Sequence, residues 1–475
     1  MKPRLASPLI VLASVAITVG MGLAVLWQWA AANTTFDPQP TIAATADPTL
    51  NLTTPVLSLR RAPGVLSRRL NVDEFAAELQ PLLDATDGTS CSAVAVDGQI
   101  VAAENPSIPV IPASNLKLAV AAVALDVLGA NYTFATAAVG ELGSDGVVAG
   151  DLGIIGGGDP VLSTDWWPTA QVNAGHPPIN VTRLEDLADQ LVAAGLTRVA
   201  GRVVGDGSRY DDEFFGPSWD PSLKVAEGGP YDALLVNDGW TTQSIGGVAA
   251  DPALGAAQLF TALLRERGVP VSQGAVAGVA AFSNEIAAVQ SRPLSAIIEE
   301  MLLTSDNNTA EMLVKEIGLM DSGVGSTAAG LQAITNRMLG WGVPLEGVVL
   351  IDGSGLARDS RLTCATLVAL LAHGSVDDAL GKGLPVAATS GTLTDVFVGS
   401  LVAGNLRAKT GTLSGVKALA GYLPVVGGST IQFAVVLNTP GVDEGTAYLS
   451  IWEDRLAPAL VTYPSAATVA ELAPR

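Results

Sequence analysis

Two short, mostly apolar stretches of the chain flank the dipeptide Asp97-Gly98. Residues 90–96 and 99–103 are rich in Val, Ile and Ala, a composition typical of strands. An Asp-Gly pair between two such stretches favours a two-residue turn. The pattern therefore predicts a β-hairpin near the start of the globular part of the chain.

Apolar residues then recur at helical spacing through a stretch that begins near Ser114 and ends near Leu128. Pro112 lies just before this stretch and Gly129 follows it, as is typical of the two ends of a helix. The sequence therefore predicts a helix with Ser114 in its first turn.

From about residue 140 the sequence pattern changes: stretches rich in glycine and β-branched residues alternate with turns. Strand patterns lie at 147–155, 199–204 and 276–281, and helical patterns lie at 184–194 and 256–267. We expect an inserted, mostly β domain over residues 140–288.

After Pro293 the chain returns to helical patterns, followed by strands and a last helix. The helices are expected at 294–303, 309–319, 327–339 and 446–461, and the strands at 406–409, 416–423 and 431–437. Helices around an antiparallel sheet that an insertion interrupts make an α+β fold. The main domain is then split into two parts, 66–139 and 289–475.

The N-terminus carries a targeting signal. Two basic residues precede an uncharged, mostly apolar stretch over 5–33, which exceeds the roughly 20 residues that a helix needs to cross a bilayer. Residues 1–32 can be an uncleaved signal anchor or a secretory signal that is cut after the alanines at 30–32. The length, together with Trp27 and Trp29 as an interfacial belt, favours the anchor. Either way the body is exported, and residues 33–65, rich in Thr, Pro and Ala, form an extended linker.

Charge excludes one class of partner. The chain has 46 acidic and 25 basic residues, a net charge of -21. Nucleic-acid binding needs a basic surface, so no nucleic-acid partner is expected. With 49% hydrophobic residues the chain should fold, and its acidity is best interpreted as a soluble surface.

Cysteine and histidine are scarce. An exported compartment permits a disulfide between Cys91 and Cys364, but two buried thiols fit the sequence equally well. His176 and His373 stand far apart without ligand spacing, so no zinc site is expected.

Three short strings carry the candidate chemistry, and the first is Ser114-Asn115-Leu116-Lys117. Residues three apart on a helix share a face, so the Ser114 hydroxyl and the Lys117 amine can meet. Burial among apolar neighbours would lower the pKa of Lys117, as a neutral-amine base requires. Taken alone, such a string is more often a helix cap followed by a surface lysine.

The second string is Ser305-Asp306-Asn307, which lies between two predicted helices. A loop there would direct Ser305 and Asn307 into a cleft, while Asp306 anchors the loop. Ser305 can relay a proton, and the Asn307 amide can hold a peptide carbonyl. The alternative is a simple cap on the following helix.

The third string, Lys409-Thr410-Gly411-Thr412, ends a predicted strand. A cation, two hydroxyls and a glycine that permits close backbone approach suit a substrate that ends in a carboxylate. The alternative is a strand-end turn. The chain has seven lysines, and two of them occupy required places in the strings, which argues against chance.

A further match to the first pattern, Ser414-Gly415-Val416-Lys417, should be inert. It lies on strand-like sequence, where residues three apart point to opposite faces.

The three strings occur together in this order in penicillin-binding proteins and class A β-lactamases. From about Ser67 to its C-terminus the chain resembles the S13 peptidase family of D-alanyl-D-alanine carboxypeptidases, the class C low-molecular-mass penicillin-binding proteins. Other blocks that carry the resemblance are Gly156-Gly157-Gly158-Asp159-Pro160, Leu235-Val236-Asn237-Asp238, Asp352-Gly353-Ser354-Gly355-Leu356 and Leu384-Pro385-Val386-Ala387. The 191 positions between Ser114 and Ser305 leave room for an inserted domain, which class A β-lactamases lack.

The resemblance implies a β-lactamase/transpeptidase-like fold and an acyl-enzyme mechanism. Ser114 would attack the carbonyl between the last two D-alanines of a peptidoglycan stem peptide. Lys117 would take its proton, and Ser305 would help to pass it to the departing D-alanine. The backbone N–H groups of Ser114 and Thr412 would form the oxyanion hole.

The resemblance also implies how the substrate is held. Asn307 would orient the peptide amide, and the strand segment Lys409, Thr410, Gly411 and Thr412 would bind the terminal carboxylate. β-Lactams would trap the nucleophile, and cross-links could be cut by endopeptidase action. No metal or organic cofactor is implied, and the membrane is a partner only through the N-terminal segment.

Two other functions stay open. A serine β-lactamase would need a group that activates water for deacylation, and no carboxylate stands in the pattern that lactamases use. A non-catalytic penicillin sensor or envelope scaffold would have no need of all three strings.

Overall fold

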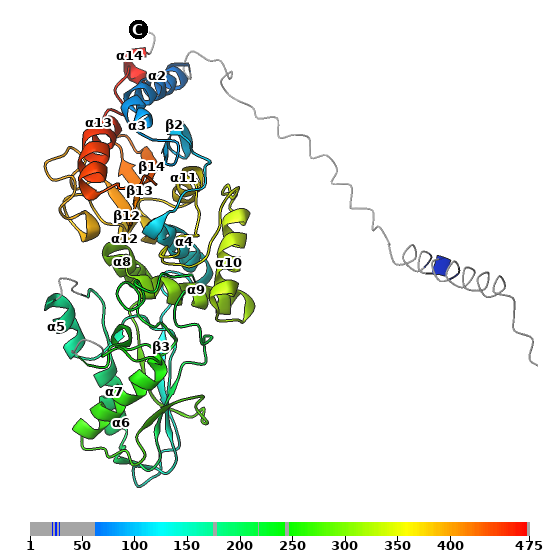
Figure 1. Ribbon diagram of the computed structural model, residues 1–475, viewed down its shortest axis with the longest axis vertical. Coiled ribbons are helices and arrows are strands. Elements are labelled where there is room, and N and C mark those ends of the chain that lie inside the picture. Colours follow the sequence, from blue (N-terminus) through cyan, green and yellow to red (C-terminus); the bar gives the residue numbers. More distant parts are fainter. Residues whose placement is uncertain are drawn as a thin grey trace, which may run out of the picture. The chain divides into compact units, whose positions relative to one another are not determined.

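The first strands of the globular part pair with the last strands in one antiparallel sheet, as the computed structural model of the protein shows (Figure 1). The structure describes residues 62–173, 178–216, 218–242 and 247–472, and four positions between Met21 and Gln28. The sheet has the order β12-β13-β14-β1-β2. Its strands are β1 (Cys91–Val96), β2 (Gln99–Glu104), β12 (Arg407–Leu413), β13 (Val416–Pro424) and β14 (Thr430–Leu437).

The predicted hairpin is confirmed between β1 and β2. Asp97 and Gly98 have φ angles of 51° and 79°, the left-handed conformation that a two-residue turn of this kind requires. The strands predicted at 406–409, 416–423 and 431–437 correspond to β12, β13 and β14.

One face of this sheet is built from small residues, which lets helices pack closely on it. Ala93 and Ala95 of β1 share their hydrophobic cluster with Ala418 and Ala420 of β13. The helices of the cluster are α4 (Lys117–Leu128), α8 (Leu294–Thr304), α9 (Asn307–Ser322), α10 (Thr327–Gly340) and α11 (Cys364–His373). The helices predicted at 294–303, 309–319 and 327–339 are thereby confirmed, with shifts of at most a few residues at their ends.

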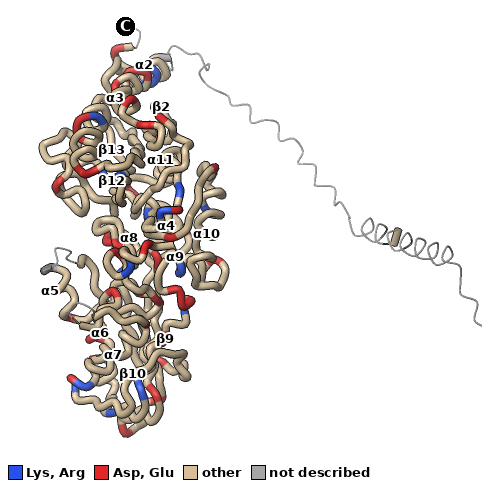
Figure 2. The backbone as a smooth tube through the Cα atoms, in the orientation of Figure 1, with Lys and Arg blue, Asp and Glu red and all other residues tan. Residues whose placement is uncertain are grey.

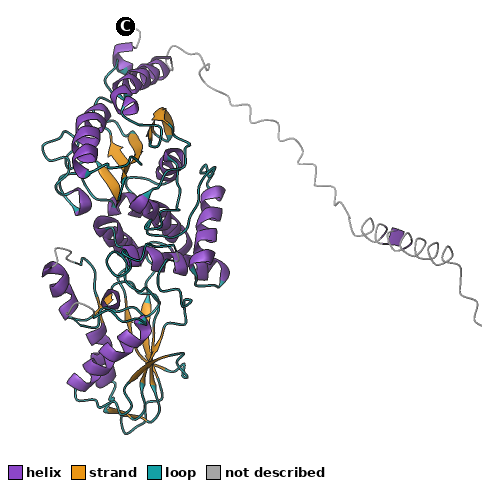
Figure 3. Ribbon diagram, in the orientation of Figure 1, coloured by secondary structure: helices purple, strands orange, loops and turns teal. Residues whose placement is uncertain are grey.

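The opposite face carries larger side chains. Val94 and Val96 of β1 alternate with the alanines and pack into a second cluster with Phe75, Phe433 and Trp452. The helices on this side are α2 (Ala62–Glu78), α3 (Gln80–Asp84), the π-helical η4 (Gly445–Leu456) and α13 (Ala457–Leu460). Helices therefore cover and bury both faces of the sheet (Figure 3), and the helix predicted at 446–461 is confirmed.

A disulfide joins the sheet to a helix. Cys91 in β1 and Cys364 at the start of α11 are bonded, with their Cα atoms 5.9 Å apart, and both are fully buried. The sequence left this pairing open, because 273 positions separate the two cysteines.

The residues between α4 and α8 form a second, mixed sheet of order β10-β9-β5-β3-β11. Its strands are β3 (Ala135–Val139), β5 (Leu152–Ile155), β9 (Val203–Asp206), β10 (Ala275–Ala277) and β11 (Glu285–Gln290). Two short pairs accompany it, β4 (Val147–Val148) with β8 (Arg198–Val199) and β6 (Leu162–Ser163) with β7 (Thr182–Arg183). The boundaries at 140 and 288 stay predictions, although β3 and β11, which enter and leave this sheet, pair side by side.

Helices α6 (Leu184–Ala193) and α7 (Pro252–Glu266) pack on the second sheet and confirm the two helical patterns predicted there. α6 buries Leu184, Leu187 and Leu191, which share one face at helical spacing. The helix α5 (Trp166–Asn173) precedes them. The remaining short elements are η1 (Ala113–Leu116), η2 (Asn237–Gly239), α12 (Ala379–Gly383), η3 (Gly391–Leu393) and α14 (Val469–Leu472).

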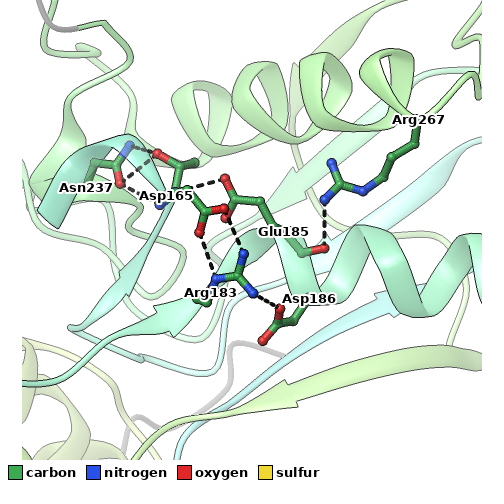
Figure 4. A network of polar contacts seen from close by, with 7 residues as sticks. Asp165, Arg183, Glu185, Asp186, Asn237 and Arg267 are labelled. Carbon is green, nitrogen blue, oxygen red and sulfur yellow. Dashed lines mark hydrogen bonds and ion pairs between the residues drawn. The ribbon is translucent and has the colours of Figure 1, made fainter. Parts of the chain in front are cut away.

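A polar network joins the start of α5 to β7 and the start of α6 (Figure 4). The Asp165 carboxylate accepts two hydrogen bonds from the Arg183 guanidinium, each 2.7 Å long, and the same guanidinium donates to Asp186. The backbone N–H of Asp165 donates to Glu185. The start of α5 is thereby fixed to the start of α6.

Acidic residues are spread along the whole described body, mostly on its helices and loops (Figure 2). All but four positions of the predicted targeting segment at 1–32, and nearly all of the predicted linker at 33–65, lie outside the described residues. None of the helices in the described part of the chain combines the length and the apolar character needed to span a membrane.

Candidate active site

A cavity of about 670 Å³ lies where the η1 turn, the α8–α9 loop and the strand β12 come together. Five of the predicted site residues line it, namely Ser114, Ser305, Asn307, Thr410 and Thr412. The three strings, which are far apart in the sequence, are therefore brought to one place.

Ser114 and Lys117 meet as the helical spacing predicts. Ser114 lies in the tight turn η1, and Lys117 is the first residue of α4. The Lys117 Nζ donates to Ser114 Oγ at 3.0 Å, to Asn307 Oδ1 at 2.7 Å and to the backbone carbonyl of Ser354 at 2.8 Å. These three acceptors match the three donors of an ammonium group.

The environment of Lys117 favours a loss of charge. Its side chain has 0% exposure, and burial lowers its pKa from 10.5 to about 8. The negative charges of Asp306, Glu311, Asp352 and Glu227 oppose this shift, with Asp306 the largest of them. Lys117 can therefore give up its proton in a pH range close to neutrality.

The turn that carries Ser114 is held in an uncommon conformation. Ala113 has a φ of 47°, which is costly for a residue other than glycine and persists only where the surroundings enforce it. Gly355 presses against this turn, because a Cβ at Gly355 would come within 2.0 Å of the Ala113 carbonyl oxygen. On the other side a Cβ at Gly411 would come within 2.9 Å of the Pro112 oxygen. Both glycines thus allow the backbone to approach the nucleophile closely.

The Ser305-Asp306-Asn307 loop contributes residues both to the cavity and to the N-terminal cap of the helix α9. Asp306 is the N-cap, and its carboxylate accepts hydrogen bonds from the backbone N–H groups of Asn308 and Thr309. Ser305 adopts a left-handed conformation with φ of 63°. Asn307 is fixed at both ends of its amide, since Nδ2 donates to the Glu227 carbonyl at 2.6 Å and Oδ1 accepts from the lysine. The cap interpretation is confirmed, and Ser305 and Asn307 line the cavity, while their roles in a reaction stay predictions.

Lys409 lies behind the cavity rather than in its wall. It has 0% exposure, and its Nζ donates to Ser305 Oγ at 3.0 Å and to the Thr410 carbonyl at 2.8 Å. Burial, and secondarily the charge of Lys117, lowers its pKa well below 10.5. Direct contact between Lys409 and a substrate carboxylate stays a prediction, whereas its contact with Ser305 is observed.

Several groups of the site have no counterpart in the predicted set. Thr392 Oγ1 lies 2.7 Å from Thr410 Oγ1, and the carbonyls of Ser354 and Glu227 accept from Lys117 and Asn307. Glu311 accepts from the backbone of the loop that contains Ser354. Its position four residues after Asn307, on the same face of α9, is the one signal in the sequence that could have pointed to it.

The further match at Ser414–Lys417 covers the β12–β13 turn and the start of β13, so it does not lie on a helix. Lys417 Nζ donates to Thr412 Oγ1 and to Glu444 rather than to Ser414.

Residues 69–246 and 235–455 match the model of the D-Ala-D-Ala carboxypeptidase 3 (S13) family. The chain belongs to this family. S13 is a peptidase family, so the protein is an enzyme, and the recognition of the family from its motifs is confirmed.

Named S13 relatives agree with this assignment. The D-alanyl-D-alanine carboxypeptidase of Actinomadura sp. (strain R39) is 30% identical over 479 residues, which cover 82% of this chain and 85% of the relative. Carboxypeptidase DacB of Mycolicibacterium smegmatis is 32% identical and covers 72% of this chain and 74% of its own. The crystal structure of penicillin binding protein 4 from Haemophilus influenzae aligns with a TM-score of 0.66 at 21% identity, over 83% of this chain and all of that chain. This likeness confirms the predicted fold class.

We expect Asp306→Ala to weaken both the fold and the site. Loss of an N-cap carboxylate costs about 1 kcal/mol of unfolding free energy, and the α8–α9 loop would also lose its anchor. Asp251→Ala is the matched control, because Asp251 caps α7 through the backbone N–H of Leu254, away from the cavity. Thermal unfolding and carboxypeptidase assays of both variants check this. Similar stability losses with a rate loss in Asp306→Ala alone are expected, and equal activities would contradict the expectation.

Proposed function

We propose that the protein is a serine DD-carboxypeptidase that hydrolyses peptidoglycan stem peptides ending in D-Ala-D-Ala. It can also cut cross-links as a DD-endopeptidase, and β-lactams acylate it. The observation that carries this proposal is the contact of 3.0 Å between Ser114 Oγ and the Nζ of a fully buried lysine. Membership of the S13 family and the name of the Actinomadura relative support the substrate class.

In the proposed acylation the neutral Lys117 accepts the proton of Ser114 as Oγ attacks the carbonyl carbon of the penultimate D-alanine. The turn η1 presents the Ser114 backbone N–H as an oxyanion donor, with the Thr412 N–H as the second donor. The negative charge that develops on the carbonyl oxygen is thereby stabilised.

Collapse of the tetrahedral intermediate breaks the C–N bond, and the departing D-alanine amine takes up a proton. Ser305 relays this proton from Lys117, and Lys409 holds the Ser305 hydroxyl in place. Water then hydrolyses the ester on Ser114 and releases the shortened peptide.

Thr410 and Thr412 line the cavity and bind the terminal carboxylate of the substrate, with the amine of Lys409 buried behind them. Asn307 orients the peptide amide. A β-lactam reproduces this carboxylate and acyl group, and a β-lactam complex of the Haemophilus influenzae protein has the same fold at a TM-score of 0.61.

The test is an incubation of the exported body with fluorescent penicillin and with a stem peptide that ends in D-Ala-D-Ala, using wild type and Ser114→Ala. We expect label that is released slowly, free D-alanine from the peptide, and the loss of both in Ser114→Ala. Rapid turnover of penicillin would indicate a β-lactamase. Stable label without peptide cleavage would indicate a sensor, and label that persists in Ser114→Ala would contradict the assignment of the nucleophile.

We also propose that the body is exported and that residues 1–32 anchor it in the cytoplasmic membrane. The uncharged stretch over 5–33 supports this, and so does the Cys91–Cys364 disulfide, because such bonds persist in oxidising compartments. Fractionation of cells that express the full chain should find it uncut in the membrane fraction and open to external protease. A shorter, soluble form outside the cell would instead indicate a cleaved signal, and a cytosolic location would contradict export.

A further inference from the structure

The orientation of the Lys117 amine depends on a backbone carbonyl. A charged lysine has three N–H donors, and Ser114, Asn307 and Ser354 accept them. The neutral amine has two N–H donors and one lone pair. If the donors stay on Asn307 Oδ1 and the Ser354 carbonyl, the lone pair points to Ser114 Oγ, as a base requires.

The loop that carries the Ser354 carbonyl is held by two buried carboxylates. Glu311 Oε1 accepts from the Ser354 N–H at 2.7 Å, and Glu311 Oε2 accepts from the Gly353 N–H at 3.0 Å. Asp352 accepts from the Ala357 N–H at 2.7 Å and from the Trp219 indole at 2.9 Å. Because both oxygens of Glu311 receive N–H groups, a glutamine in its place would turn an amide N–H toward one of them.

Glu311 reaches this loop from the helix that also carries Asn307. Its side chain has 0% exposure, and it forms no ion pair with Lys or Arg in the part of the chain that the structure describes. A buried carboxylate without a cationic partner is costly and needs its hydrogen bonds. A carboxylate thus stands in a buried position where its hydrogen bonds to the Gly353 and Ser354 N–H groups offset its desolvation, which points to a role in holding this loop.

We propose that Glu311 is a positioning residue for acylation, which holds the Asp352–Gly355 loop so that the Ser354 carbonyl orients the Lys117 amine toward Ser114. This inference rests on the proposed function, since it assigns the geometry of the same base.

The charge of Glu311 has a second consequence. Lys117 faces Asp306, Asp352, Glu227 and Glu311, whose charges favour the ammonium, and Lys409, whose own pKa is lowered by the charge of Lys117. Glu311 itself faces Asp352, and burial, together with that neighbour, raises the pKa of Glu311 to about 7. Removal of the Glu311 charge should therefore lower the pKa of Lys117.

The experiment measures the second-order rate of Ser114 acylation by penicillin between pH 5 and pH 9. Mass spectrometry of the labelled peptide locates the acyl group. In wild type the rate should rise through about pH 8, because Lys117 must be neutral to act. In Glu311→Gln we expect a rate at least roughly tenfold lower at the optimum. We also expect the acidic limb of the profile, the pH range in which the rate rises, to move to lower pH by roughly half a unit or more.

Glu316→Gln is the matched control. Glu316 is a fully buried carboxylate on the same helix, but it contacts Arg209, Tyr132 and Tyr210 rather than the loop. Its replacement should lower thermal stability and leave the acidic limb in place. Glu311→Asp keeps the charge, so the acidic limb should stay near its wild-type position while the rate falls. This variant also tests the inference if Glu311→Gln does not fold.

An acidic limb in Glu311→Gln that coincides with wild type, with a rate loss no larger than that of Glu316→Gln, would overturn the inference while leaving the proposed function intact. The same holds if the limb of Glu311→Asp moves in the direction expected for the glutamine variant. Wild-type protein that penicillin does not acylate at Ser114 would overturn the proposed function, and the inference with it.

Discussion

The Lys117 side chain lies where water does not reach it, and the rest of the site depends on this burial. An ammonium group that leaves water without partners loses several kcal/mol of solvation, so the fold must supply an acceptor for every donor. It does so from three separate segments, through Ser114, Asn307 and the Ser354 carbonyl. The same burial that demands these partners also lowers the pKa of Lys117 to about 8. Burial of Lys117 is thus the common cause of its need for three hydrogen-bond acceptors and of its lowered pKa.

This requirement accounts for how the surrounding elements are arranged. The α8–α9 loop must bring Asn307 to the lysine, and Asp306 fixes that loop by capping α9. The strand β12 must approach η1 closely, which the missing side chain of Gly411 allows. Pairing of β1 with β14 and the Cys91–Cys364 disulfide hold the sheet and the helices on which these segments are mounted. The segment between α4 and α8 extends the cavity wall, since Ser163 of β6 and Trp167 of α5 line the cavity.

Much of this could be predicted from the sequence, because the decisive signals are local. Helical spacing placed Ser114 and Lys117 on one face, and the Asp97-Gly98 turn identified the first hairpin. The role of Ser354 could not be predicted in this way, because a backbone carbonyl acts without regard to its side chain. Contact of Lys409 with a substrate carboxylate stays a prediction, whereas its hydrogen bond to Ser305 joins two strings that are far apart in the sequence and so could not be predicted from either one. The contact of Glu311 with the Asp352–Gly355 loop could not be predicted either, because the two are far apart in the sequence.

The central claim is that the fold makes Lys117 a base, and the most direct measurement is its titration in the folded protein. Lysine labelled with ¹⁵N can be followed by NMR, with Lys117 assigned by comparison with Lys117→Arg, which keeps a cation at the position. The structure predicts a midpoint near pH 8 for this one resonance, well below the ordinary lysine pKa of 10.5. A Lys117 resonance that titrates near 10.5 would contradict the account.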